Sequence, residues 1–279
     1  MSPVGTPSTR QTAVPLRHRP SVTEMTAVEL SQLVAAFRKL QGIDGDRGYQ
    51  HLAGLHGLPL PFYGEQTYGQ PMFLPWNRAY LYHFELALRA TGHEAMLPWW
   101  DWITIRRIPA PYQGISGRNN PLHSVEINKL ALEQGRDGES REGHVGGVGL
   151  AHIAHTVREH GRSGTRLPTA SEIEGVTAYA DFTSFTSKLE DYNGNVHVWV
   201  GGHMGDTRFA TYDPLFWAHR CMIDRLWRVW QLRHPQASFP MHLADQVMEP
   251  FNLTAKDVLD PTALGYDYVS SSRTLKVKG

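Results

Sequence analysis

The chain has 279 residues, of which 41% are hydrophobic and 19% are charged, and its formal net charge at pH 7 is zero. This balance gives no electrostatic basis for binding nucleic acid or an anionic membrane surface, and no apolar run approaches the ~20 residues of a membrane span. The single cysteine, Cys221, excludes an internal disulfide and is typical of a reducing compartment. We therefore expect a cytoplasmic protein whose partner is a small molecule, with its oligomeric state left open.

The N-terminal residues 1–20 contain no apolar core of a secretory signal, and we expect them to form a flexible tail. Residues 21–279 show no internal repeat and no linker, so a single domain is predicted. Ser21 stands three residues before Glu24, a capping-box pattern that predicts the start of the first helix.

Further helices are expected at residues 48–56 and 75–91, and a strong one is expected between Pro214 and Pro235. Residues 108–175 are rich in glycine, proline and polar residues, which predicts a long excursion with short helices. The predicted fold class is mainly α, a four-helix bundle core with long loops.

Two of these helices carry a polar residue within an apolar stripe. Asn77 begins a stripe that continues with Leu81, Phe84 and Leu88. Arg220 shares a second stripe with the following apolar residues: Phe216, Ile223 and Trp227. A buried guanidinium is costly unless it meets a carboxylate or an anion, so we expect Arg220 to face a cavity with such a partner. An intrahelical ion pair with Asp224, four residues on, is the alternative.

Several longer motifs occur in a familiar order. The segments "FLPWNRAYLYHFE", "LPWWDW", "VHVWVGGHMGD", "DPLFWAHRCMIDRLWRVWQ" and "LGYDY" resemble the bacterial tyrosinases of the type-3 copper family. The resemblance covers roughly residues 19–268, outside the 108–175 excursion. It implies a tyrosinase-like fold in which each of two coppers is held by three histidines of a four-helix bundle and dioxygen binds between the metals.

The resemblance also assigns the ligand positions of this chain. The first copper's ligands fall on His56, Tyr68 and Asn77, and the second copper's fall on Asn193, His197 and Arg220. Only two of the six histidines therefore remain. An asparagine amide is a weak ligand for copper, and an arginine stays protonated and places a positive charge where a cation would sit. We expect no metal and no other cofactor.

The replacements are all polar, which favours a repurposed pocket over a decayed one, although single-base changes of histidine codons would also produce them. The leading hypothesis is a metal-free enzyme doing acid/base chemistry, such as cyclisation, isomerisation or addition/elimination, on an aromatic or related small metabolite in natural-product biosynthesis. The alternatives are a non-catalytic pseudoenzyme or binding protein and a degenerate copper oxidase.

Specific roles follow from this hypothesis. His56 and His197 are expected to exchange protons near neutral pH, and Arg220 is expected to hold a carboxylate or an oxyanion. Glu190 matches the carboxylate that the resembled family places beside its site and completes the catalytic set. The expected substrate-binding residues are Tyr68, Asn77, Asn193 and His203.

Two patterns lie outside this constellation. "AHIAHTVREH" would place His152, His155 and Glu159 on one helical face, a pattern typical of either a zinc site or an exposed polar surface. The tryptophans Trp99, Trp100 and Trp102 are expected in the core.

Overall fold

The computed structural model describes residues 16–61, 63–64, 67, 69–114, 119–137, 144–145 and 148–268. Over these residues the chain is mainly helical, as the sequence predicts. The helices are α1 (Ala27–Gln41), α2 (Tyr49–Gly54), α3 (Phe73–Ala90), α4 (Lys129–Asp137), α5 (Ala170–Thr177), α6 (Phe182–Val200) and α7 (Leu215–Arg233). The strands are β1 (Arg17–Arg19), β2 (His144–Val145), β3 (Val148–Gly149), β4 (Val247–Met248), β5 (Leu253–Thr254) and β6 (Tyr266–Tyr268).

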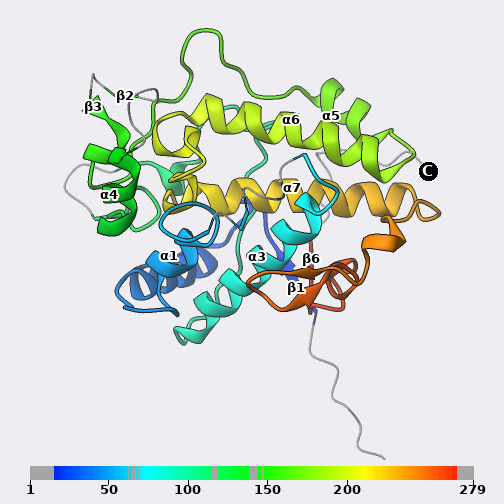
Figure 1. The fold of residues 1–279 in the computed structure, drawn as a ribbon, viewed down its shortest axis with the longest axis horizontal. Coiled ribbons are helices and arrows are strands. Elements are labelled where there is room, and N and C mark those ends of the chain that lie inside the picture. Colours follow the sequence, from blue (N-terminus) through cyan, green and yellow to red (C-terminus); the bar gives the residue numbers. More distant parts are fainter. Residues whose placement is uncertain are drawn as a thin grey trace, which may run out of the picture.

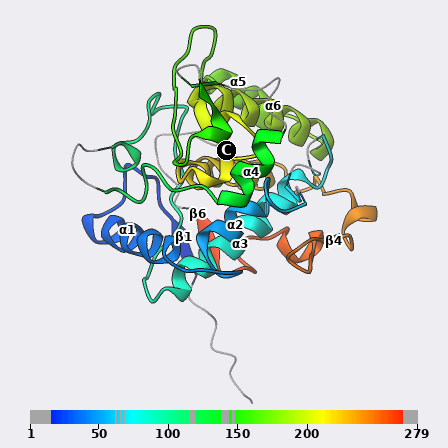
Figure 2. The ribbon, with the colours of Figure 1, turned by 60° about the vertical axis from the view of Figure 1, so that its left-hand side comes forward.

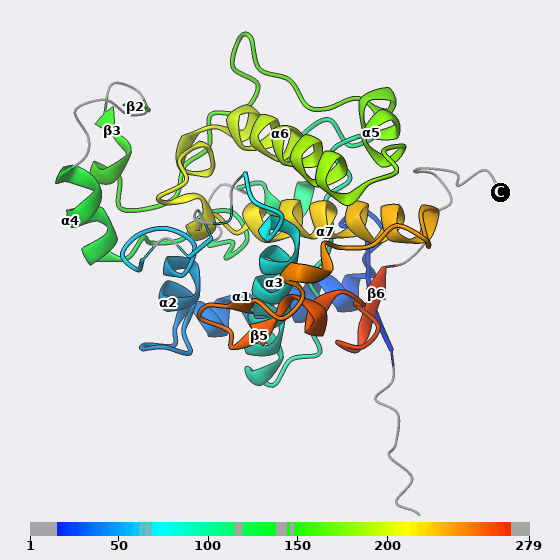
Figure 3. The same ribbon diagram turned by 45° about the vertical axis from the view of Figure 1, so that its right-hand side comes forward.

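The core is built around α7. Helix α6 runs beside α7 along its length, and α3 crosses α7 on the opposite side (Figures 1 and 3). Helix α2 joins this core through Tyr80 of α3, whose hydroxyl donates to the carbonyl of Leu52 at 2.6 Å. Helix α4 and the β2–β3 hairpin lie at one end of the molecule (Figure 3), while β4 lies on a flank (Figure 2). The predicted four-helix core is therefore present.

The strands are short and serve as ties between distant segments. Strand β1 pairs in parallel with β6, which joins the two ends of the described chain. The β2–β3 and β4–β5 pairs are antiparallel hairpins. Trp99, Trp100 and Trp102 are fully buried, which confirms their predicted place in the core. No helix among the described residues is long and apolar enough to cross a lipid bilayer.

The first helix starts later than the sequence pattern predicts. Its N-cap is Thr26, which forms a capping box with Glu29, so the pairing of Ser21 with Glu24 was wrong. Ser21 instead contacts the hydroxyl of Thr23 and forms an isolated bridge with Trp99. Both capping boxes satisfy the same spacing rule, and the core contact of residue 21 decides between them.

A buried ion-pair cluster ties α3 and α7 to the two ends of the chain. Asp224 of α7 accepts from the Nε of Arg78 at 2.6 Å and from the Nη1 of Arg19 at 3.3 Å. The hydroxyls of Tyr266 and Tyr268 also donate to Asp224. Burial alone would raise the pKa of Asp224, but Arg78 and Arg19 hold it below its ordinary value.

This cluster corrects two expectations. Asp224 is fully engaged by these groups, so the intrahelical pair between Arg220 and Asp224 is not formed. The flexible tail predicted over residues 1–20 is also wrong at its end, because residues 17–19 form β1 and Arg19 is fully buried against Glu85 and Asp224. Residues 1–15 lie outside the described part of the chain.

Replacing Asp224 by asparagine tests the importance of this cluster. The change leaves the guanidinium groups of Arg78 and Arg19 buried without their shared carboxylate, and breaking a buried pair in this way costs about 3–5 kcal/mol. We expect urea denaturation to show a loss of this size. The control is Asp245→Asn, which removes an exposed partner of Lys256 and should change the free energy of unfolding by less than about 0.5 kcal/mol. Equal losses in the two variants would contradict the assignment.

Candidate functional site

The sequence-predicted positions converge from four elements. His56 follows α2, Asn77 lies on α3, Asn193 and His197 lie on α6, and Arg220 lies on α7. Their side chains are buried, except that His197 and Glu190 are partly exposed. Tyr68 lies outside the described residues.

Arg220 occupies the centre of this group. Its Nη2 lies 3.2 Å from the Nε2 of His56, to which it donates a hydrogen bond. The guanidinium carbon stands 4.8 Å from the ring centre of Phe216 and 5.3 Å from that of Phe73. The side-chain amide of Asn77 reaches the backbone carbonyl of Arg220 at 3.4 Å. A fixed cation is thus held between aromatic faces and a neutral imidazole.

The two family histidines are neutral acceptors. His197 donates from Nδ1 to the carbonyl of Met204 at 2.7 Å, and its Nε2 has no hydrogen-bond partner among the described residues. Burial and then the charge of Arg220 lower the pKa of His197 to about 3. Burial, Arg220 and His197 likewise lower the pKa of His56 well below its usual value. In the ligand-free protein both rings are therefore shifted toward the neutral form, and their expected exchange of protons with a substrate stays a prediction.

Glu190 supplies the carboxylate of the site. It lies on α6, one turn before Asn193 and two before His197, and accepts from the backbone N–H of Gly69 at 2.7 Å. Burial raises the pKa of Glu190 above its ordinary value, although the Gly69 hydrogen bond and the charge of Arg220 act in the opposite direction. The raised pKa means that Glu190 binds a proton at a higher pH than an exposed glutamate does.

A cavity of about 420 Å³ lies against α6, and its described lining includes Glu190, Asn193 and His197 but not the buried His56, Asn77 or Arg220. These three residues belong to its α6 wall, and Gly69, Met204, Gly205 and Thr207 lie across from them in the lining. A cavity of this size accommodates one substituted aromatic ring. The arrangement places polar groups on one wall of the cavity, and the charge of the buried Arg220 acts on two of them, Glu190 and His197.

His219 belongs to the site but was not selected from the sequence. It is fully buried on α7, and its Nε2 lies 3.0 Å from the Oδ1 of Asn193. Its ring stands edge-on to that of His197, with 4.9 Å between the ring centres. The available signal was its place beside Arg220, since adjacent residues on a helix lie about 100° apart and both can face a polar core.

His203 does not join the group. It is fully buried, accepts from the backbone N–H of Val157 at Nδ1 and donates from Nε2 to the carbonyl of Leu150, both at 3.0 Å. Because backbone groups occupy both nitrogens, His203 ties two loop segments to the end of α6 and presents neither nitrogen to a ligand.

The possible zinc site rested on a helix that does not form. His152 ends a 3-10 turn, and the chain then runs extended, with Thr156 bonded to the carbonyl of Val125 and Glu159 to that of Val200. His155 and Glu159 therefore share no helical face with His152. Within the described ranges, no group of three or more histidine, cysteine or acidic side chains has a geometry suited to a metal.

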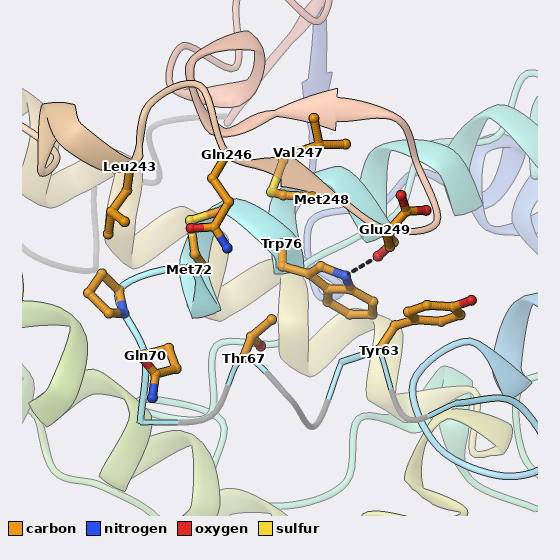
Figure 4. Close-up of a pocket in the computed structure, with 11 residues that line it drawn as sticks. Tyr63, Thr67, Gln70, Met72, Trp76, Leu243, Gln246, Val247, Met248 and Glu249 are labelled. Carbon is orange, nitrogen blue, oxygen red and sulfur yellow. Dashed lines mark hydrogen bonds between the residues drawn. The ribbon is translucent and has the colours of Figure 1, made fainter.

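A second pocket, of about 270 Å³, lies between the start of α3 and the β4–β5 hairpin (Figure 4). Trp76 forms its floor and donates from its indole N–H to the carbonyl of Glu249 at 2.8 Å (Figure 4). The ring centres of Trp76 and His56 lie 6.1 Å apart, and a Cβ on Gly64 would lie 2.4 Å from a ring carbon of His56. Trp76 and the backbone of Gly64 thus cover His56 on this side, and none of the site residues that were predicted from the sequence and are described in the structure lines this pocket.

Comparison with known proteins gives the same framework a name. The family described as "Common central domain of tyrosinase" matches residues 46–233, about two thirds of the chain. The chain belongs to the tyrosinase family. A tyrosinase of Streptomyces glaucescens is 33% identical over 224 residues, which cover 72% of this chain and 80% of that protein.

Two further proteins resemble this chain more distantly, one in sequence and one in fold. Hemocyanin 2 of Megathura crenulata is 27% identical over 249 residues, which cover 82% of this chain but only 7% of that much longer protein. A copper-depleted tyrosinase of Aspergillus oryzae, solved with L-tyrosine, superposes with a TM-score of 0.75 over 91% of this chain and 93% of that one, at 19% identity.

The tyrosinase family implies a pair of coppers, and the donor set of this chain does not fit them. At the described ligand positions, two asparagines and an arginine stand with two histidines. The Nε2 of His56, which would face a metal, accepts from Arg220 instead. Copper binding requires deprotonated, electron-donating ligands, and a guanidinium supplies neither a lone pair nor a tolerable charge.

The low pKa of His197 makes stability depend on pH. Its folded-state value is about 3 and its unfolded value is about 6.5, so between these limits the unfolded chain binds a proton that the folded chain does not. The contribution of His197 to the free energy of unfolding is therefore present above pH 6.5 and is lost progressively as the pH falls toward 3. Replacing His197 by glutamine, which cannot titrate, should reduce the loss between pH 7 and pH 5 by up to about 2 kcal/mol.

The measurement is a set of urea denaturation curves at pH 5, 6, 7 and 8 for both proteins. At pH 7 and above, the difference in free energy of unfolding between the wild-type protein and His197→Gln should be constant. This constant difference measures the effect of the contacts that glutamine changes, apart from titration. Parallel curves down to pH 5 would contradict the assigned shift.

Proposed function

We propose that this tyrosinase-family chain is an enzyme that performs acid/base chemistry without copper on an aromatic or related small metabolite. Cyclisation, isomerisation and addition/elimination are the reaction types that suit such a site. The observation that carries the proposal is the guanidinium of Arg220, held 3.2 Å from His56 where the family places a metal. Apolar side chains would fill a decayed core position more stably than a buried cation does.

The roles of the groups follow from their charges. Arg220 stabilises negative charge that develops on a substrate oxygen, as a fixed donor in a dry pocket does. His197 offers a lone pair at Nε2 for a substrate proton, and the arriving negative charge offsets the effect of Arg220 that depresses its basicity. Glu190, with its raised pKa, returns or relays the proton.

The relatives support the class of substrate. The Aspergillus oryzae tyrosinase was solved with L-tyrosine, an aromatic amino acid, and the cavity here has room for one such ring. We propose natural-product biosynthesis as the setting, by analogy with the tyrosinase family. The single cysteine favours a cytoplasmic location. A non-catalytic binding protein is the outcome that the following experiment would reveal.

The test compares product formation in the producing cell for site variants. His197→Ala should lower the rate by about 10²–10⁴ because it removes the proton acceptor. Arg220→Ala should lower it by about 10²–10³ because it removes the oxyanion donor. Metabolite profiling by mass spectrometry measures both, and the control is His155→Gln, an exposed histidine outside the cavity, which should leave the output unchanged.

A filled pocket separates catalysis from decay. In the variant His56→Leu/Asn77→Leu/Asn193→Leu/Arg220→Met, apolar residues replace the buried polar set. We expect the product to disappear even if the melting temperature rises. A more stable protein with unchanged metabolite output would mean that the pocket carries out no chemistry.

A further inference from the structure

His219 contacts one end of the Asn193 amide. The Oδ1 of Asn193 lies 3.0 Å from the Nε2 of His219, whereas the Nδ2 has no hydrogen-bond partner within the described residues. Asn193 lines the 420 Å³ cavity, and His219 is fully buried behind it. One end of the amide is therefore held from behind and the other end is available to a ligand.

The protonation of His219 decides the polarity of this contact. With hydrogen on Nε2, the ring donates to Oδ1 and its Nδ1 remains a buried acceptor, with no partner among the described residues. With hydrogen on Nδ1, the amide would have to turn round and donate to Nε2, and the Nδ1–H would then be a buried donor without an acceptor. Orphaned buried N–H groups are rarer than under-satisfied acceptors, and such a group costs about 1–3 kcal/mol.

We propose that His219 is a positioning residue which, through its Nε2–H, fixes Asn193 with its amide hydrogens toward the cavity. The α6 wall then presents a donor at Asn193, while the Nε2 of His197, one helical turn on, is a buried acceptor with no partner among the described residues. Residues four apart on a helix have Cβ atoms about 5–6 Å apart, so a ligand held at Asn193 reaches this acceptor once the side chains that cover it move aside.

This polarity names a substrate class, an inference that rests on the proposed function. The substrate carries an oxygen that accepts hydrogen bonds, as a carboxylate or a carbonyl does, at the Asn193 end. It carries an acidic hydrogen, on oxygen, nitrogen or an activated carbon, at the His197 end. The charge of Arg220, which also lowers the pKa of His197, favours an anionic form of that ligand. An aromatic hydroxy acid satisfies all three conditions within the cavity volume.

The first measurement reads the tautomer directly and needs no substrate. ¹⁵N NMR of the histidine rings, with the His219 signals assigned by their loss in His219→Gln, should show hydrogen on Nε2 and a bare Nδ1 at neutral pH. Hydrogen on Nδ1 would overturn the proposal. This outcome is independent of whether the protein turns anything over.

The second measurement is calorimetric binding of 4-hydroxybenzoate, with 4-hydroxybenzyl alcohol as the neutral probe of the same shape. The wild-type protein should bind the acid at least about tenfold more tightly than the alcohol. Asn193→Asp should abolish this preference, because a carboxylate repels the anion. His219→Leu should weaken binding of the acid about tenfold, whereas His219→Gln, which restores a donor to Oδ1, should stay within about threefold of wild type.

These variants separate positioning from a merely structural role. A merely structural role would make binding of the acid fall together with melting temperature in both variants, whereas positioning predicts that His219→Leu loses binding while His219→Gln, which restores the donor to Oδ1, keeps it. Unchanged acid binding in His219→Leu would overturn the proposal. If the binding and tautomer results are as expected but product formation does not depend on His197 or Arg220, the proposed orientation of the Asn193 amide is supported and the proposed catalytic function is refuted.

Discussion

The ion pair between Arg78 and Asp224 fixes the register of α3 against α7, and the site depends on that register. The two groups meet at 2.6 Å in the core. Asn77 directly precedes Arg78, and Arg220 lies one turn before Asp224, so the clasp brings Asn77 to the backbone carbonyl of Arg220. In this chain an ion pair outside the site thus holds α3 and α7 in the positions that would orient metal ligands. Because this pair does not involve the site residues, those residues can be replaced while the two helices keep their positions.

Electrostatics then determine what the altered site can do. Arg220 adds a permanent charge to a region of aromatic rings and buried imidazoles. Burial first, and then the charge of Arg220 among other groups, lowers the pKa values of His56, His197 and the neighbouring His219. These histidines are therefore poor bases in the ligand-free protein. A substrate that brings negative charge reverses part of this effect. Under the proposed function, proton transfer would therefore depend on the charge of the bound ligand rather than on the resting protonation of the protein.

Much of the fold could be predicted because its signals are local. Apolar periodicity and prolines located α1, α2, α3 and α7, although not α6, and an arginine within an apolar stripe located Arg220 in the interior. The errors concern residues whose neighbours are distant in sequence. Arg19 lies in a run of three basic residues that looks like a solvated tail, yet it meets Glu85 and Asp224 in the core. His203 looks like a site residue from its motif, but backbone groups far along the chain take both its nitrogens. The contact between His219 and Asn193 depends on how α6 and α7 are rotated against each other, which no local sequence pattern specifies.

The central claim is that a fixed cation has replaced the metal pair, and copper retention tests it most directly. The protein and the variant Asn77→His/Asn193→His/Arg220→His would each be incubated with excess copper, separated by gel filtration and analysed for metal. The account predicts that the wild-type chain retains no stoichiometric copper, because Arg220 stays protonated, and that the variant gains copper, because three imidazoles are restored. A pair of coppers retained by the wild-type chain, with oxidation of catechol, would contradict it.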